Sequence, residues 1–219
     1  MRVFFLTSIT VLLLLAGCST TRNYYIEPEY QKSKIRSSVL VLPIQREWFE
    51  DNYMHTFGSL SGNQKTAFYS SLRHLFSEQI NSELYAVDPS KNFPDSLFMS
   101  TTLSTGASQF EAMVPRKNVK LEFEGVMPRI VLVLDQYFYR EKSELSGGSS
   151  YAGHEAEVKN FLYFETKYVY WDTEKGVPLA WGVSDAHIEM PAGESIGFQD
   201  YLAVLSKAVD KVAKQGPIL

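Results

Sequence analysis

Five consecutive apolar residues at positions 130–134, Ile-Val-Leu-Val-Leu, constrain the fold of this chain more than any other feature. Successive side chains of a β-strand point to opposite faces of its sheet, so a strand without polar alternation must be covered on both faces. Residues 39–42, Val-Leu-Val-Leu, show the same pattern and end at Pro43, which cannot donate a ladder hydrogen bond. The two runs predict interior strands, one at 39–42 and a central one over residues 130–139.

Two stretches with apolar residues at three- and four-residue spacing predict the main amphipathic helices. The first covers about residues 63–84 and starts beside Ser61 and Gln64, which match a capping box. The second covers about residues 197–214 and ends before Gly216 and Pro217.

Several further segments have the alternation of β-strands. Residues 157–171 predict a long aromatic-rich strand, which a turn at 172–176 joins to a returning strand at 177–188. The segments 97–103 and 109–114 suit a short hairpin, although a loop with one irregular helix fits equally well. Residues 119–123 predict one more half-buried strand.

The order of these elements predicts an α/β (α+β) fold. We expect a five- to six-stranded mixed, largely antiparallel sheet, with both helices packed against it. Of the 219 residues 45% are hydrophobic, which is enough for a single domain to build its own core.

The first 17 residues are a predicted signal peptide. Arg2 supplies the positive start, and the apolar run that follows is shorter than the roughly 20 residues of a spanning helix. Residues 15–18, Leu-Ala-Gly-Cys, resemble the bacterial lipobox. That resemblance implies cleavage between Gly17 and Cys18, with a diacylglyceryl group on the Cys18 thiol and an acyl chain on its amino group. Cys18 is the single cysteine, so an internal disulfide is excluded.

Residues 18–34 are a predicted lipidated tether, followed by a single domain at 35–219. The three tyrosines of the tether could pack on the domain or lie at the lipid headgroups. An aspartate after the cysteine resembles an inner-membrane retention signal, so Ser19 favours the outer membrane, with the domain facing the periplasm. Loss of Arg2 takes the net charge from −4 to −5, which disfavours nucleic acid as a partner.

The residue types that carry catalysis do not form a recognisable constellation. The four histidines lie in separate segments, and the position where a zinc-protease motif starting at His154 needs its second histidine holds Val158. Ser184, Asp185 and His187 have the residue types of a hydrolase triad, but one strand rarely brings such residues together. We therefore predict no enzyme, no metal site and no cofactor besides the acyl chains.

Aromatic residues give the positive prediction of a binding surface. The segment 45–60 carries a cluster of four: Trp48, Phe49, Tyr53 and Phe57. Aromatic side chains are favoured at protein interfaces, so the cluster is a candidate partner contact. Packing of the loop on its own domain explains the cluster equally well.

The assembled pattern resembles bacterial envelope lipoproteins with a small α/β domain, including the curli-secretion-channel-like and peptidoglycan-synthase-activator groups. The similarity is carried by residues 39–43, 63–84, 129–135 and 168–182 and covers most of residues 38–188. It implies a fold similar to the amino-terminal domain of the Tol-Pal translocation protein. It also implies a non-catalytic accessory or assembly factor that binds another envelope protein, and it transfers no functional residue except Cys18.

Two alternative functions follow from related resemblances. The closing helix and residues 22–25 are similar to auxiliary lipoproteins of ABC-type envelope transporters. One class of relatives forms secretion pores by inserting hairpins in a homo-oligomeric ring. A membrane strand needs about 9 to 11 alternating residues, and the segments 97–103 and 109–114 are shorter.

Overall fold

The computed structural model of the chain describes residues 22–44, 64–86, 93–146, 157–191 and 195–219. Its elements, in chain order, are β1 (Tyr24–Ile26), α2 (Pro28–Lys32), β2 (Val39–Ile44), α4 (Gln64–Gln79), β3 (Leu84–Ala86), η2 (Asp95–Leu97), β4 (Phe98–Ser104), β5 (Gln109–Pro115), β6 (Ile130–Ser146), β7 (Glu157–Asp172), β8 (Val177–Met190) and α6 (Phe198–Lys214).

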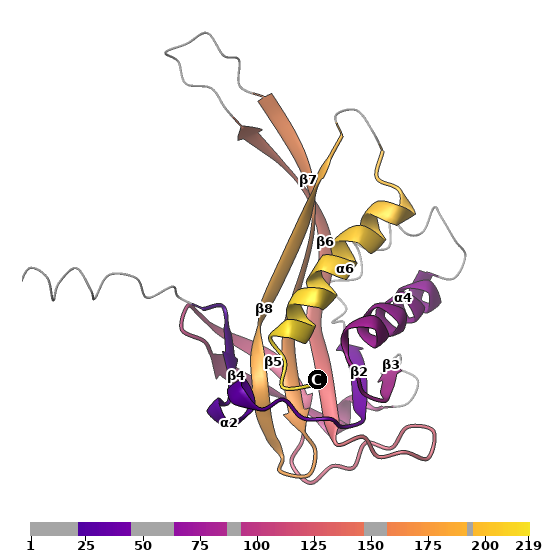
Figure 1. Cartoon of the computed structure of the whole chain (residues 1–219), viewed down its shortest axis with the longest axis vertical. Helices are drawn as coiled ribbons and strands as arrows, with labels where there is room; N and C mark the ends of the chain where they lie inside the picture. Colours follow the sequence, from indigo (N-terminus) through magenta and orange to yellow (C-terminus); the bar gives the residue numbers. More distant parts are fainter. Residues whose placement is uncertain (1–21, 45–63, 87–92, 147–156, 192–194) are drawn as a thin grey trace, which may run out of the picture.

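The main sheet has six strands in the order β1-β8-β7-β6-β2-β3, and β4 pairs with β5 in a second, two-stranded sheet (Figure 1). The strands β6, β7 and β8 form an antiparallel meander, and β1 adds antiparallel to β8. The strands β2 and β3 continue the sheet in parallel with β6. The predicted α/β fold with a mixed, largely antiparallel sheet is confirmed.

Both apolar runs lie inside this sheet, and each is covered on its two faces. Val39 pairs with Ile130, and the register continues to Ile44 opposite Asp135. One face of the sheet packs against α4 and α6, through Val39, Val41, Ile130, Leu132 and Leu134. The opposite face carries Leu40, Leu42, Val131 and Val133, which pack with the β4–β5 hairpin. Figure 1 shows the helices and the hairpin on opposite sides of the sheet.

Both predicted helices are present, but the first is shorter than its pattern. α6 matches the predicted range, whereas α4 ends at Gln79 instead of residue 84. The backbone of Asn81 donates to the Leu219 carbonyl, which turns the chain out of the helix. Leu84 continues the apolar spacing of the helix in the sequence, but in the structure it is buried in β3, opposite Val39.

The segment predicted as a tether belongs to the fold over much of its length. Residues 24–26 form β1 on the edge of β8, and Tyr30 of α2 is buried in the core beneath the helices. Tyr25 stacks on Trp181, with ring centroids 4.3 Å apart. The tyrosines pack on the domain because β8 offers an unpaired edge and an aromatic partner, so the structure differs from a tether that continues to residue 34.

Residues 119–123 do not form the predicted strand. Asn118 and Glu124 have positive φ angles of 66° and 52°, and Gly125 follows with 78°. These left-handed residues interrupt an extended chain, and Phe123 forms only an isolated bridge with Val126. Leu121 is nevertheless buried against the hairpin side of the sheet.

Of the two readings for residues 97–114, the hairpin is confirmed. Phe98 pairs with Pro115 and Ser104 with Gln109, over seven residues in each strand. The amide of Thr105 donates to the Ser108 carbonyl and closes the turn. The hairpin buries its apolar side chains against the face of the sheet that lies opposite α4 and α6.

The predicted turn between β7 and β8 is also confirmed. The buried carboxylate of Asp172 accepts hydrogen bonds from the backbone amides of Glu174 and Lys175, at 2.9 Å each, and pairs with Arg129 at 3.3 Å. Gly176 has a φ of 65°, a conformation that disfavours other residues.

We predict that Gly182→Ala destabilises the edge that holds β1. A Cβ at this position would lie 2.7 Å from the Asn23 carbonyl oxygen and 2.8 Å from the Tyr168 hydroxyl. Overpacking of this kind costs about 1–3 kcal/mol, which chemical denaturation measures. Gly106→Ala is the matched control, since its Cβ would meet nothing nearer than 3.6 Å. Equal stability of the two variants would contradict the prediction.

Candidate functional site

The residues predicted to carry function lie outside the described residues. This applies to the processing site at Gly17 and Cys18, and to the aromatic cluster Trp48, Phe49, Tyr53 and Phe57. The lipidation and the partner contact at the cluster therefore stay predictions.

The triad residue types on β8 are not arranged as a triad. Ser184 is buried, while His187 is exposed and its ring packs on that of Tyr163. Because they are three positions apart on one strand, the two side chains point to opposite faces of the sheet. Asp185 pairs with Lys211 of α6 at 2.8 Å, and this hydrogen bond lowers the pKa of the Asp185 carboxyl. In the part of the chain that the structure describes, no three His, Cys, Asp or Glu side chains gather as for a metal ion.

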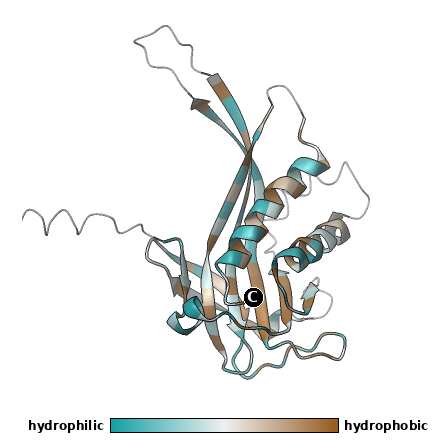
Figure 2. Cartoon of the chain, viewed as in Figure 1, coloured by the Kyte–Doolittle hydropathy of each residue, from teal (hydrophilic) through white to brown (hydrophobic). Residues whose placement is uncertain are grey.

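The β6–β7 pair continues beyond the end of β2, and we call this part the arm: residues 138–146 of β6 and 157–165 of β7. Its lower portion still pairs with β8, and only its end, residues 144–146 and 157–159, extends past β8. β8 ends at Met190, opposite Asn160, and β6 and β7 continue past it as a pair as far as Ser146 and Glu157 (Figure 1). In Figure 2 hydrophilic and hydrophobic residues alternate along the arm, whereas brown dominates the strands in the lower sheet.

Two apolar side chains are exposed near the end of the arm. Leu145 is 76% exposed and Val158 is 55% exposed, and the two residues lie directly opposite each other. They are on the same face of the hairpin as Leu162, which is buried in the core. The apolar face of the hairpin is therefore buried near Leu162 but exposed to solvent at Leu145 and Val158.

The other face of the arm carries a cluster of rings. Tyr163 of β7 packs against both Phe161 and His187, with ring centroids 6.2 Å and 5.0 Å away. Phe161 and His187 also meet edge to face at 5.5 Å. The guanidinium of Arg140 lies 5.2 Å from the centroid of the Tyr163 ring and forms an ion pair with Glu165. The cluster combines aromatic faces with fixed charges, as protein-binding surfaces do.

Hydrogen bonds hold the charges of this cluster in place. Glu144 accepts from Lys142 at 2.7 Å and from the Tyr163 hydroxyl at 3.1 Å. The bond from Lys142, followed by that from Tyr163, lowers the pKa of Glu144. Partial desolvation, with the bond to Glu144, raises the pKa of Tyr163. The carboxylate and the phenol therefore keep one protonation state across the neutral range.

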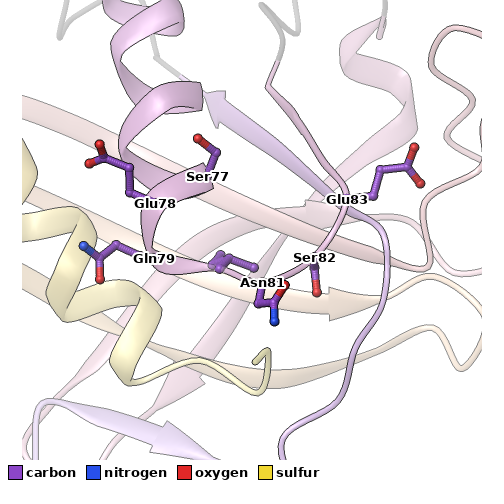
Figure 3. A pocket seen from close by; sticks show the side chains of 7 residues that line it. Ser77, Glu78, Gln79, Asn81, Ser82 and Glu83 are labelled. Atoms are coloured by element: carbon purple, nitrogen blue, oxygen red, sulfur yellow. The ribbon is translucent and has the colours of Figure 1, made fainter.

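A surface hollow of about 590 Å³ lies at the end of α4, lined by residues 77–83 (Figure 3). Its walls come from one continuous segment, and in Figure 3 Glu78 and Glu83 point in different directions. Polar groups that bind a small molecule converge on one point. Glu78 and Glu83 do not converge, so we do not assign a binding site to this hollow.

Comparison with known proteins adds little to this geometry. No family model matches the chain, and no curated protein matches it. Among solved structures, one described as a neuraminyllactose-binding hemagglutinin homolog from Helicobacter pylori covers 82% of each chain, with a TM-score of 0.37 and 10% sequence identity.

Sequence reasoning missed the arm because it ended the central strand at residue 139. Residues 140–146 are mostly charged or polar, which indicates exposure but does not end a strand. A usable signal was the length of the predicted strand at 157–171. An antiparallel partner of that length must continue well past residue 139, since paired strands have matching lengths.

Proposed function

We propose that this protein is a lipid-anchored envelope lipoprotein, facing the periplasm from the outer membrane, that binds another envelope protein without catalysing a reaction. The observation that carries the binding role is the exposed apolar pair Leu145 and Val158 on the arm. The lipobox-like residues 15–18 support the anchor. The arm supplies the surface through which an accessory or assembly factor would hold its partner.

The physical argument for the arm rests on unrecovered burial. Transfer of a leucine or valine side chain from water to an apolar contact gains about 1.5–3 kcal/mol. Leu145 and Val158 stay exposed within the described part of the chain, although Leu162 on the same face is buried in the core. A partner that covers the pair would recover it, with the ring cluster on the opposite face as a second contact.

The β4–β5 hairpin gives a reason to prefer this function over a pore subunit. Its strands have seven residues each, and Phe98, Phe110 and Val114 are buried on the sheet. Insertion into a membrane would expose that core, which costs free energy in proportion to the apolar area uncovered.

The test is crosslinking in intact cells with a double variant, Leu145→Glu and Val158→Lys. Opposite charges at a cross-strand pair keep the hairpin paired but remove its apolar surface. Loss of about 2 kcal/mol or more weakens binding more than tenfold, so we expect the crosslinked complex with another envelope protein to disappear. Mass spectrometry identifies the captured protein.

Met127→Glu is the matched control, because Met127 is 59% exposed and lies away from the arm. It places a charge at an exposed apolar position outside the arm and is expected to leave the complex intact. If the double variant folds normally and retains the same crosslinked partner as the control, the arm is not the binding surface.

A further inference from the structure

We propose that one corner of the domain, at the β1 edge of the sheet, rests on the lipid headgroups of the membrane. We call it the β1 corner and define it as Arg22, Tyr25, Trp181 and the turn at 104–108. The inference depends on the lipid anchor of the proposed function and extends it, because it names the surface of the folded domain that meets the bilayer.

The first argument is the length of chain between the anchor and the fold. Cys18 precedes Arg22 by four residues, and an extended chain spans at most about 3.6 Å per residue. The α-carbon of Arg22 can therefore lie no further than about 14 Å from that of an acylated Cys18. Since β1 begins at Tyr24, the anchor holds this edge of the sheet at the membrane surface.

The second argument is the construction of the corner. Tyr25 and Trp181 stack at an interplanar angle of 27°, and both are half-buried. The indole nitrogen of Trp181 donates to the Ser104 carbonyl at 2.9 Å, which joins β8 to the β4–β5 turn. A Cβ on Gly106 would lie 3.6 Å from the backbone nitrogen of Arg22, so the turn and the entering chain are in contact.

The third argument is the chemistry of the corner. Tyrosine and tryptophan favour the membrane interface, since their rings prefer the apolar side and their polar atoms the wet side. Within the segments 22–26, 104–109 and 179–184, Arg22 is the single charged residue. Its guanidinium suits a lipid phosphate. The remainder of the corner can approach headgroups without desolvating a carboxylate.

The test uses the full lipidated chain in vesicles of phosphatidylethanolamine and phosphatidylglycerol. A cysteine at the exposed turn, Ala107→Cys, carries a spin label, and collisions with a water-soluble nickel chelate report the exposure of the label. Leu145→Cys on the arm is the matched control. Val158, opposite Leu145, is ten residues along β7 from Tyr168, which pairs with Gly182 beside β1. At about 3.3 Å per residue the control lies roughly 33 Å from the corner.

We expect the label at position 107 to lose accessibility in vesicles while the label at 145 retains it. The same labels in the unlipidated Cys18→Ser chain, free in solution, should be equally accessible. Equal accessibility in the vesicle-bound chain would overturn the β1 corner and leave the anchor standing. If labelling instead finds two free thiols in each labelled variant, Cys18 is not acylated, and both proposals fall.

Discussion

Cys18→Ser is expected to convert the protein from a membrane-bound to a water-soluble form. Each buried CH₂ of an acyl chain contributes about 0.8 kcal/mol, so several chains give essentially permanent attachment, while a single chain gives reversible binding. Serine provides no thiol for the diacylglyceryl group, and lipidation does not proceed. The variant is expressed behind a secretory signal that is cleaved without lipidation, because an uncleaved apolar segment at residues 3–16 would itself hold the chain in the pellet. Fractionation with a carbonate wash, followed by immunoblotting, measures the change as a move from the pellet to the supernatant.

The neighbouring substitution Ser19→Ala is the control for the anchor. It leaves the Cys18 thiol in place and is expected to keep the protein in the pellet. Mass spectrometry of the amino-terminal peptide adds a direct readout, because acylation and cleavage before Cys18 change its mass together. Recovery of the Cys18→Ser chain in the washed pellet would refute the lipid anchor.

Alkaline pH is expected to destabilise the domain steeply through Tyr168 and Tyr170. Both side chains are fully buried between β7 and α6, and burial raises the pKa of each phenol far above its ordinary value. The unfolded phenol titrates near 10. Their stabilising contribution is therefore complete below about pH 10 and is lost as the pH rises above it.

The expected slope follows from two phenols that stay protonated in the folded state. Each costs about 1.4 kcal/mol per pH unit above 10, so the free energy of unfolding falls by roughly 2.7 kcal/mol per unit. Denaturation at a series of pH values measures it. Replacing both tyrosines by phenylalanine should flatten the curve.

Tyr25→Phe is the control for the alkaline effect, since Tyr25 is only half-buried at the edge of the sheet. A curve that stays equally steep in the variant with both buried tyrosines replaced would show that other groups control alkaline unfolding. The hydroxyls donate to Gln215 and to the Val212 carbonyl, at 2.8 Å and 3.1 Å, so their removal also carries a constant cost independent of pH.

Prediction from sequence succeeded where the local pattern and the tertiary environment agree. Residues 39–42 and 130–134 lie in interior strands because nothing but coverage on both faces can satisfy an unbroken apolar run. α6 matched its range because an apolar stripe on the helix faces the sheet over its whole length. The turn at Asp172 and Gly176 matched because its side-chain and backbone requirements are local.

Prediction failed where distant segments compete for the same residues. Leu84 continues a helical spacing, yet its backbone pairs with Val39 in the parallel β2–β3 ladder. Residues 24–32 contain no strong strand or helix pattern, and their structure depends on the free edge of β8. The alternation at 119–123 is overridden by left-handed residues at both ends.

The sequence by itself determined the composition of the core, the two helices, the meander and the prediction of an anchor at Cys18, because each rests on a local pattern of burial or a contiguous motif. Only the tertiary structure decided that the amino-terminal segment adds an edge strand to the sheet and that β6 and β7 extend beyond their neighbouring strands as an arm. Both depend on where other strands end, and no local residue pattern encodes the length of a neighbour.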